Sequence, residues 1–221
     1  MGVTRIQRSM NDTSKISALM ESYPRRPRQV DGPLCLDFIN NVPVACDDPS
    51  NYQELVRWGY SVDVLDEQGA LRLLELGGRQ PDEAAAVWRH TVAFSEALYR
   101  LFSTWIRDGH FPKKDLDVLN RQLSHAMGQS QLETGVDRLA WGWSARGYAL
   151  DYPLWPVVKS AAGLLSSDDL ARIGECASGT CQCLFLDTSK NRGRRFCGET
   201  CSNVTRVRRH RERQRAEAST K

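Results

Sequence analysis

The strongest constraint on how this chain can fold is a set of four cysteines near its C-terminal end. Cys176 and Cys181 form a C-x4-C pair, and Cys197 and Cys201 form a C-x3-C pair. Cysteine thiolates are soft ligands, and two close pairs can converge on one tetrahedral ion without a large core behind them. The spacing therefore predicts one structural Zn²⁺ ion bound by these four side chains, because four thiolates leave no coordination position for a water molecule.

The local sequence around each pair predicts how the ligands are presented. Gly179 lies inside the first pair and can adopt the positive φ angle that a tight knuckle needs. Residues 183–186 and 194–197 flank the turn-like sequence at 191–193, which predicts a hairpin between them. The members of the second pair are four residues apart, so they lie on one face if a helix begins there. A knuckle, a hairpin and a helix in this order describe a treble-clef-like zinc finger.

This C-terminal sequence resembles the CGNR zinc-finger family of bacterial proteins. The matching features, in order, are Cys176, Cys181, the segment Leu184-Phe185-Leu186-Asp187, the segment Arg194-Arg195-Phe196-Cys197, and Cys201. The tetrapeptide that names the family is replaced here by Cys201-Ser202-Asn203-Val204, which keeps the cysteine and the asparagine. The resemblance implies the same four zinc ligands and a basic helix after them. Cys183 has three interpretations at this point: an alternate ligand, a redox partner or a small buried apolar residue.

Arginines dominate the sequence that follows the last zinc ligand. On a helix, Arg206, Arg209 and Arg213 form one stripe, and Arg208, Arg211 and Arg215 form the adjacent stripe. Residues 190–221 hold 11 of the 30 basic and 3 of the 27 acidic residues, so this segment carries +8 and residues 1–189 carry −5. The planar guanidinium suits phosphate oxygens and guanine edges. We therefore expect DNA as the partner, with a solvated basic end as the alternative. The candidate contacts are Arg194, Arg195, Asn203, Arg206, Arg208, Arg209, Arg211 and Arg213.

Residues 32–41 open a second recognisable region. This dense apolar stretch contains the polar residues Asp37 and Asn40, and it resembles the opening motif of the ABATE domain, which precedes the CGNR finger and is regarded as a stress-responsive regulator. The sequence therefore predicts a poorly ordered leader over residues 1–30, a helical ABATE-like domain over 31–170 that senses a ligand or dimerises, and the finger over 171–221.

The hydrophobic pattern of the second region predicts a mainly α fold with one small β-hairpin. Apolar residues at helical spacing predict helices over residues 55–65, 70–76, 82–107 and 113–127, a further helix from Pro153, and a last one from Ser167 to Glu175. Pro81 and Gly109 delimit the third helix, and Gly77-Gly78 is expected to end the second. Alternation between residues 129 and 150 predicts the hairpin.

The sequence offers binding residues more readily than catalytic ones. Its four histidines are isolated, and it has no nucleophile elbow, phosphate-binding loop or dinucleotide motif, so we expect no enzyme activity. Its six tryptophans either pack in the core or line a cavity for an apolar ligand. The candidate pocket residues are Asp37, Asn40, Trp58, Trp141 and Trp155.

Two functions follow from these patterns. The first is a transcriptional regulator whose zinc finger presents an arginine-rich helix to DNA, with a small-molecule effector or homodimerisation as the role of the helical domain. The second is a small-molecule-binding protein or enzyme in which the finger is a structural or protein-interaction module.

The chain lacks a long apolar run and a secretory leader, and its seven cysteines suit a reducing compartment, so we expect a cytoplasmic protein that does not enter a membrane.

Overall fold

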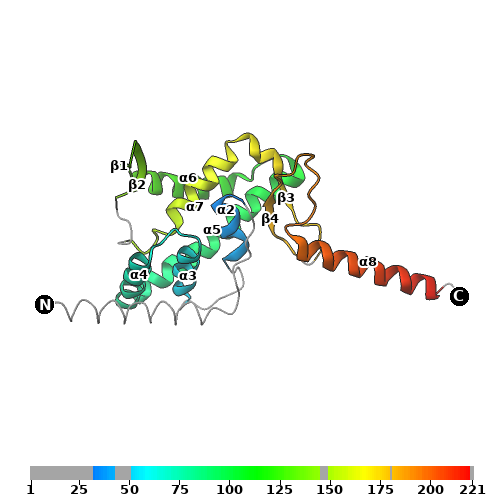
Figure 1. The fold of residues 1–221 in the computed structure, drawn as a ribbon. Helices are drawn as coiled ribbons and strands as arrows, with labels where there is room; N and C mark the ends of the chain where they lie inside the picture. The colour runs from blue at the N-terminus through cyan, green and yellow to red at the C-terminus, as the bar shows by residue number, and fades with distance from the viewer. Residues whose placement is uncertain (1–31, 43–50, 145–148, 180, 220–221) are drawn as a thin grey trace.

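The chain folds into a group of packed helices that carries a small finger and one long projecting helix (Figure 1). The computed structural model describes residues 32–42, 51–144, 149–179 and 181–219, with the side chains at 209, 210, 213 and 216–219 left out. The leader expected over residues 1–30 lies outside these ranges. The mainly α class with small hairpins is confirmed. None of the helices in the described ranges is long and apolar enough to cross a membrane.

The elements follow one another along the chain in two groups. The helical domain contains α2 (Leu34–Asn41), α3 (Tyr52–Ser61), α4 (Glu67–Arg79), α5 (Pro81–Asp108), α6 (Lys113–Gly128), β1 (Ser130–Thr134), β2 (Leu139–Trp143) and α7 (Leu154–Leu165). The C-terminal part contains the 3-10 helix η1 (Asp168–Arg172), β3 (Ile173–Glu175), β4 (Leu184–Leu186) and α8 (Glu199–Ser219).

Helix α5 is the longest element, and the predicted start and end signals are confirmed. Pro81 occupies its first position, and Gly109 ends it in the left-handed conformation with φ of 68°. The Gly109 N–H donates to the carbonyl of Trp105 at 3.0 Å, which satisfies one of the last helical carbonyls. The predicted apolar stripe faces the core, where Phe94, Leu98, Leu101 and Phe102 are fully buried. Helix α5 also contacts α2, β3 and β4, so it supports both the core and the finger.

The segment 32–41 forms helix α2 at the centre of the core. Phe38 packs its ring against Trp58 at 5.1 Å and against Phe94 at 6.1 Å between centroids, which joins α2 to α3 and α5. The Trp58 indole N–H donates to the Asp37 carboxylate at 2.8 Å. Burial raises the pKa of Asp37, and the hydrogen bond from Trp58 opposes that increase. The two polar residues that the sequence singled out therefore sit on a helix that connects other elements.

Helix α4 continues past the two glycines that were expected to end it, so that prediction is wrong. The helix runs to Arg79, and Gly77 packs against the ring of Tyr52, where an added Cβ would lie 2.9 Å from Cδ1. The Tyr52 hydroxyl donates to the buried carbonyl of Leu150 at 2.9 Å, so the ring cannot move away without breaking this bond. Gly77 is present because α3 and α4 approach closely. An added Cβ at Gly78 has no atom within 4 Å.

The two glycines give a matched pair of tests. We expect Gly77→Ala to lower the free energy of unfolding by about 1–3 kcal/mol, because the methyl group overpacks the contact with Tyr52. Gly78→Ala should raise it by up to about 1 kcal/mol, because alanine is the better helix former and the site is open. Urea unfolding followed by circular dichroism measures both. Equal shifts in the two variants would contradict the packing argument.

The predicted hairpin is confirmed as β1 and β2. The strands pair antiparallel with Leu132 opposite Trp141, and the Gly135 N–H donates to the Arg138 carbonyl at 2.9 Å across the turn. Trp143 at the base packs on Trp155, with 5.9 Å between ring centroids. The hairpin lies at the opposite end of the molecule from α8 (Figure 1).

The helix predicted from Ser167 to Glu175 is not formed. The chain makes one short 3-10 turn, η1, and then enters β3, which pairs antiparallel with β4 so that Ile173 lies opposite Leu186 and Glu175 opposite Leu184. The sequence pattern could not show this, because the partner strand lies beyond the first cysteine pair. The domain and the finger are therefore joined by a strand rather than by a continuous helix.

Candidate metal centre and nucleic-acid interface

The first cysteine pair lies in the turn of the β3–β4 hairpin. Cys176 directly follows β3, and its N–H donates to the carbonyl of Cys183 at 2.9 Å, which closes the turn just before β4. Gly179 has φ of 73°, so the knuckle uses the left-handed conformation that its sequence predicted. The predicted hairpin partners were wrong: β4 pairs with residues 173–175, whereas residues 194–197 form no strand.

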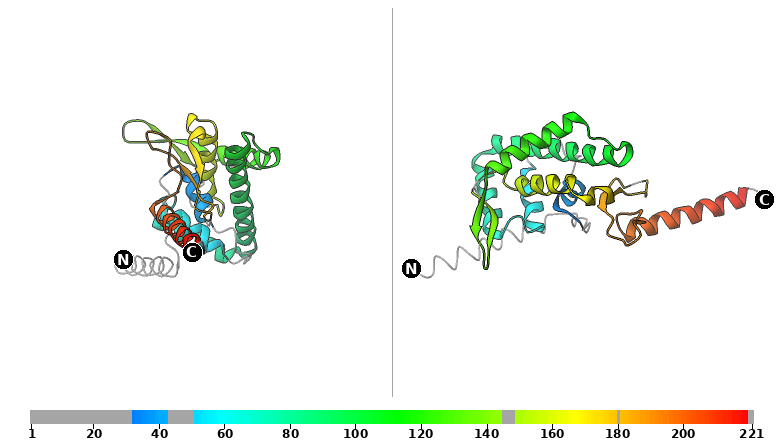
Figure 2. Two further views of the ribbon diagram at one scale, coloured as in Figure 1. Left: turned by 90° about the vertical axis from the view of Figure 1, so that its right-hand side faces the viewer. Right: turned by 90° about the horizontal axis from the view of Figure 1, so that it is seen from above.

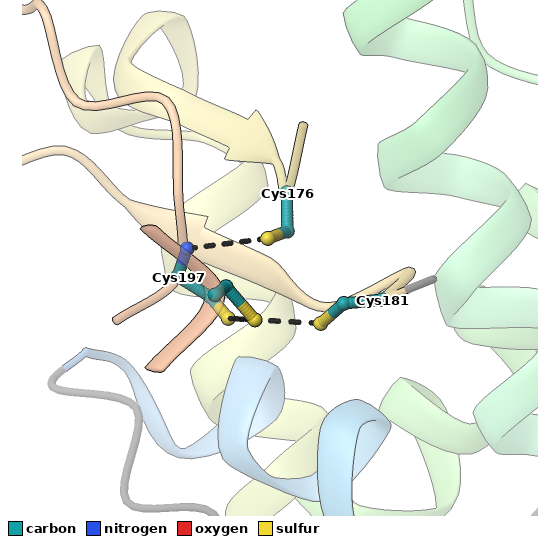
Figure 3. Close-up of side chains that lie close together, drawn as sticks. Cys176, Cys181 and Cys197 are labelled. Carbon is teal, nitrogen blue, oxygen red and sulfur yellow. Dashed lines mark hydrogen bonds between the residues drawn. The ribbon is translucent and has the colours of Figure 1, made fainter. Parts of the chain in front are cut away.

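The second pair lies at the start of α8. Cys197 precedes the helix, which begins at Glu199, and Cys201 lies in its first turn. The segment that carries Cys197 runs beside the knuckle, because the Ala177 N–H donates to the Arg195 carbonyl at 2.9 Å and the Cys197 N–H lies 3.5 Å from the Cys176 sulfur. Figure 3 shows the side chains of Cys176, Cys181 and Cys197 pointing toward one another from these separate segments.

The four sulfur atoms fit one tetrahedral ion. All four lie within 4.8 Å of one another, with 3.7 Å between Cys181 and Cys197 and 3.6 Å between Cys197 and Cys201. A zinc–sulfur distance of about 2.3 Å places tetrahedral sulfurs about 3.8 Å apart. Cys176, Cys181, Cys197 and Cys201 therefore hold one structural Zn²⁺ ion, as the sequence predicted. Cys183 is buried against Cys176 and Cys181 but is outside the group of four converging sulfurs.

Burial affects the ionisation of the thiols at this site. Burial raises the pKa of Cys197, and its hydrogen bonds to the other three sulfurs raise it further. Burial also raises the pKa of Cys201. Burial opposes ionisation of Cys181 as well, but hydrogen bonds from Cys183 and neighbouring thiols lower its pKa to about 7. A divalent ion stabilises all four thiolates together, which holds three chain segments in one arrangement.

Zinc content tests the ligand assignment. The full-length protein should contain one zinc per chain by elemental analysis, and Cys183→Ala should retain it. Cys181→Ser should lose most of the metal, because a tetrahedral thiolate site loses one of its four ligands. Loss of zinc from Cys183→Ala with retention in Cys181→Ser would show that Cys183 is the ligand.

Asp187 folds the loop that returns the chain to the metal. Its carboxylate accepts the N–H of Ser189 at 2.8 Å and the N–H of Arg194 at 2.9 Å, so one side chain ties both ends of the loop. A hydrogen bond from the Ser189 side chain, together with these two backbone bonds, lowers the pKa of Asp187. The loop also contains Arg192 with φ of 48°. Sequence reasoning assigned no role to Asp187, although its place in the matched segment after Leu186 was the available signal.

Arg194 is turned toward the finger. Its Nε donates to the Phe196 carbonyl at 3.0 Å, its Nη2 donates to the Cys197 carbonyl, and its guanidinium lies 5.0 Å from the centre of the Phe185 ring. The side chain thus supports the backbone on both sides of the third zinc ligand. Arg195 is exposed beside it. Both arginines were candidate DNA contacts. The Arg195 side chain is exposed to solvent, whereas the Arg194 side chain bonds to the backbone of the finger.

Two polar contacts dock the finger on the helical domain. The Asn40 amide donates from Nδ2 to the Leu184 carbonyl at 2.8 Å and accepts the Leu184 N–H at 2.9 Å, so it pairs with β4 as another strand would. The Tyr99 hydroxyl of α5 donates to the Glu175 carboxylate of β3 at 2.8 Å. Leu184 and Phe185 are buried at this junction. The position of the finger is therefore set by α2 and α5.

Removing the Asn40 amide should weaken this junction. Asn40→Ala leaves a buried N–H and a buried carbonyl of Leu184 without their partner, so we expect the free energy of unfolding to fall by about 1–3 kcal/mol. Asn120→Ala, an exposed asparagine on α6, is the matched control and should change stability little. Chemical unfolding of the zinc-loaded proteins measures both. An unchanged midpoint for Asn40→Ala would show that apolar packing alone docks the finger.

Helix α8 projects from the finger into solvent. Cys201 and the buried Thr205 face the finger, and beyond them the helix extends past the rest of the described chain in Figure 1 and in the right-hand view of Figure 2. Asn203 is exposed and accepts a hydrogen bond from Arg206 at 3.1 Å. Arg208 lies 3.7 Å from Glu212. Arg206, Arg208, Arg211 and Arg215 are exposed, while Arg209 and Arg213 belong to the helix but their side chains are outside the description.

In the part of the chain that the structure describes, the five candidate pocket residues are spread over separate places. Asp37 and Trp58 are bonded to each other, and Trp155 is buried and donates to Asp151 at 3.0 Å. Trp141 lies on the β1–β2 hairpin beneath Lys159, whose Nζ is 4.8 Å from the ring centre. Asn40 borders a different hollow of about 420 Å³, between α2, α5 and the knuckle. That hollow is lined by Ile39, Asn40, Glu96, Tyr99, Arg100, Gln182 and Cys183.

This arrangement defines a mainly α protein with a C-terminal, four-cysteine zinc finger. Comparison with known families agrees on both parts. The chain belongs to the ABATE family, whose description is "Putative stress-induced transcription regulator" and whose profile matches residues 32–168. The CGNR zinc finger matches residues 172–214. The resemblance inferred from the sequence is thereby confirmed, in the same N- to C-terminal order. A search among curated proteins gives no match.

Proposed function

We propose that this regulatory zinc-binding protein controls transcription by binding double-stranded DNA through α8. The observation that carries the proposal is the projecting arginine helix. Like charges on one helix repel one another, and an ion pair as exposed as Arg208–Glu212 offsets little of this repulsion. A polyanion removes that repulsion, and the zinc site fixes the start of the helix relative to the rest of the protein.

The dimensions of α8 suit the DNA major groove. An α-helix with side chains is about 10–12 Å across and the groove is about 12 Å wide. The 21 residues of α8 extend about 31 Å, which is enough to lie along one groove without contact from the helical domain. In this proposal Arg206, Arg208, Arg211 and Arg195 contact phosphate or base edges. Asn203, Arg209 and Arg213 are further proposed contacts on the same helix.

A fluorescence-anisotropy titration tests DNA binding. The full-length, zinc-loaded protein is titrated against a randomised duplex pool and against DNA upstream of its own gene, at two salt concentrations. Because phosphate contacts release counterions, the affinity should fall with salt with a log–log slope of about −0.9 for each neutralised phosphate. Replacing Arg206, Arg208, Arg211 and Arg215 by alanine should remove most of the binding.

The control removes the same charge from another surface. Arg79, Arg89, Arg121 and Arg138 are exposed on the helical domain, and their replacement by alanine should leave DNA affinity within about twofold. Equal loss in both quadruple variants would mean that net charge alone attracts the DNA. Preference for duplex RNA over duplex DNA, or no binding to either, would overturn the proposal.

The sensing part of the proposal rests on the hollow between α2, α5 and the knuckle. A small molecule bound there would contact the domain and the finger at once, next to the Tyr99–Glu175 contact. Its binding would change DNA affinity, and DNA would change its affinity by the same factor. A thermal-shift screen of small metabolites with the full-length protein tests this.

Homodimerisation, the other proposed role of the domain, is tested by analytical ultracentrifugation with and without DNA.

The alternative function treats the finger as a structural module of a small-molecule-binding protein or enzyme. The docking of β4 by Asn40 suits such a module as well as it suits a regulator. His125 bonds to Asp151 at 2.8 Å, but Asp151 also accepts from Trp155, so this pair crosslinks α6 to the start of α7. A module of this kind gains nothing from an exposed arginine helix, which is why we favour the regulator and assign no catalytic role.

A further inference from the structure

Two apolar side chains lie on the solvent-exposed surface of α8 among its arginines. Val204 is 53% exposed and Val207 is 46% exposed, whereas the neighbouring Thr205 is only 2% exposed and faces the finger. Residues spaced by three or four positions share a helix face. The exposed Thr200 and Arg211 therefore continue the same stripe on either side of the two valines. We call these four residues the valine stripe.

The composition of the valine stripe argues against a second helix as its partner. A coiled-coil seam needs apolar residues at these positions over about three or four heptads. Here the stripe has only two apolar members, and it continues through Arg211 to the exposed Gln214. Valine also lowers helix propensity, so two valines on a solvated helix bring no stability to the free protein. A partner that suits this stripe is mostly anionic, to match the arginines, and presents small apolar groups to the two valines.

We propose that Val204 and Val207 contact the C5-methyl groups of thymines in the major groove, with Arg211 at the next base edge. This inference rests on the proposed binding of α8 to duplex DNA and adds which face of the helix enters the groove. The thymine methyl is the apolar group that base pairs present in the major groove, and the arginines account for the anionic backbone around it. This face differs from the stripe of Arg206, Arg209 and Arg213 that the sequence offered among its candidate contacts.

The test removes single methyl groups from the DNA. A preferred duplex is first selected from the randomised pool, and each thymine is then replaced in turn by deoxyuridine, which lacks only the C5-methyl. We expect one or two positions at which affinity falls about fourfold, the effect of losing one buried methyl group. Val204→Ala and Val207→Ala should each bind more weakly and should no longer respond to deoxyuridine at one of these positions.

Controls on the two valine variants separate a loss of thymine contacts from a change in folding, charge or self-association. The zinc content and salt slope of both valine variants should match the parent, because no charge or ligand is removed, and their helicity should be at least that of the parent, because alanine is the better helix former. Val136→Ala, a fully exposed valine in the β1–β2 turn, is the control and should keep the parent's response. Tight binding without any deoxyuridine effect, or valine variants that keep the full effect, would overturn the inference and leave the DNA-binding function standing. Failure to bind any duplex would overturn both, and an altered sedimentation coefficient of the valine variants would assign the stripe to self-association.

Discussion

The convergence of four thiolates on one cation is the constraint on which the C-terminal half of this structure depends. The finger has two strands of three residues each, which cannot bury enough apolar surface to hold a projecting helix in place. The ion joins the end of β3, the knuckle and the first turn of α8 at one point. Asp187 and Arg194 then hold the intervening loop, one through backbone N–H groups and the other through backbone carbonyls. Metal binding and the folding of this region are therefore one event.

The second constraint is the junction between the finger and the helical domain. Asn40 satisfies both backbone groups of Leu184, and Tyr99 reaches Glu175 from a different helix. Moving the finger away would leave the buried backbone groups of Leu184 without hydrogen-bond partners, which costs free energy. The finger is therefore held against α2 and α5 in one orientation. In the proposed sensing function, these contacts and the zinc site connect the helical domain to α8. This route replaces the continuous helix that the sequence suggested between the two parts.

The two ends of the molecule differ in charge and in exposure. Residues 190–221 carry +8 and the remainder carries −5, and six of the eleven basic residues of this segment lie on α8, which leaves the body of the protein. Separation of this kind favours a polyanion near α8 and disfavours one near the helical domain. The valine stripe then distinguishes one face of that helix from the others. In the proposed DNA complex, charge attracts the helix to the duplex and the apolar pair orients it in the groove.

Local chemistry explains which features the sequence could determine. The four ligands, the positive φ of Gly179, the limits of α5 and the β1–β2 hairpin all follow from spacing or from the conformational preferences of single residues, and each was predicted correctly. The pairing of β3 with β4, the packing of Gly77 on Tyr52, the bonds from Asn40 to Leu184 and the inward turn of Arg194 could not be predicted in this way. Each of these depends on a partner that is distant in the sequence, or on the shape of a surface that exists only after folding, and one sequence records neither. The sequence by itself therefore determined the metal, its ligands and the charge of the last helix, while the tertiary structure decided where that helix points and which of its faces is free.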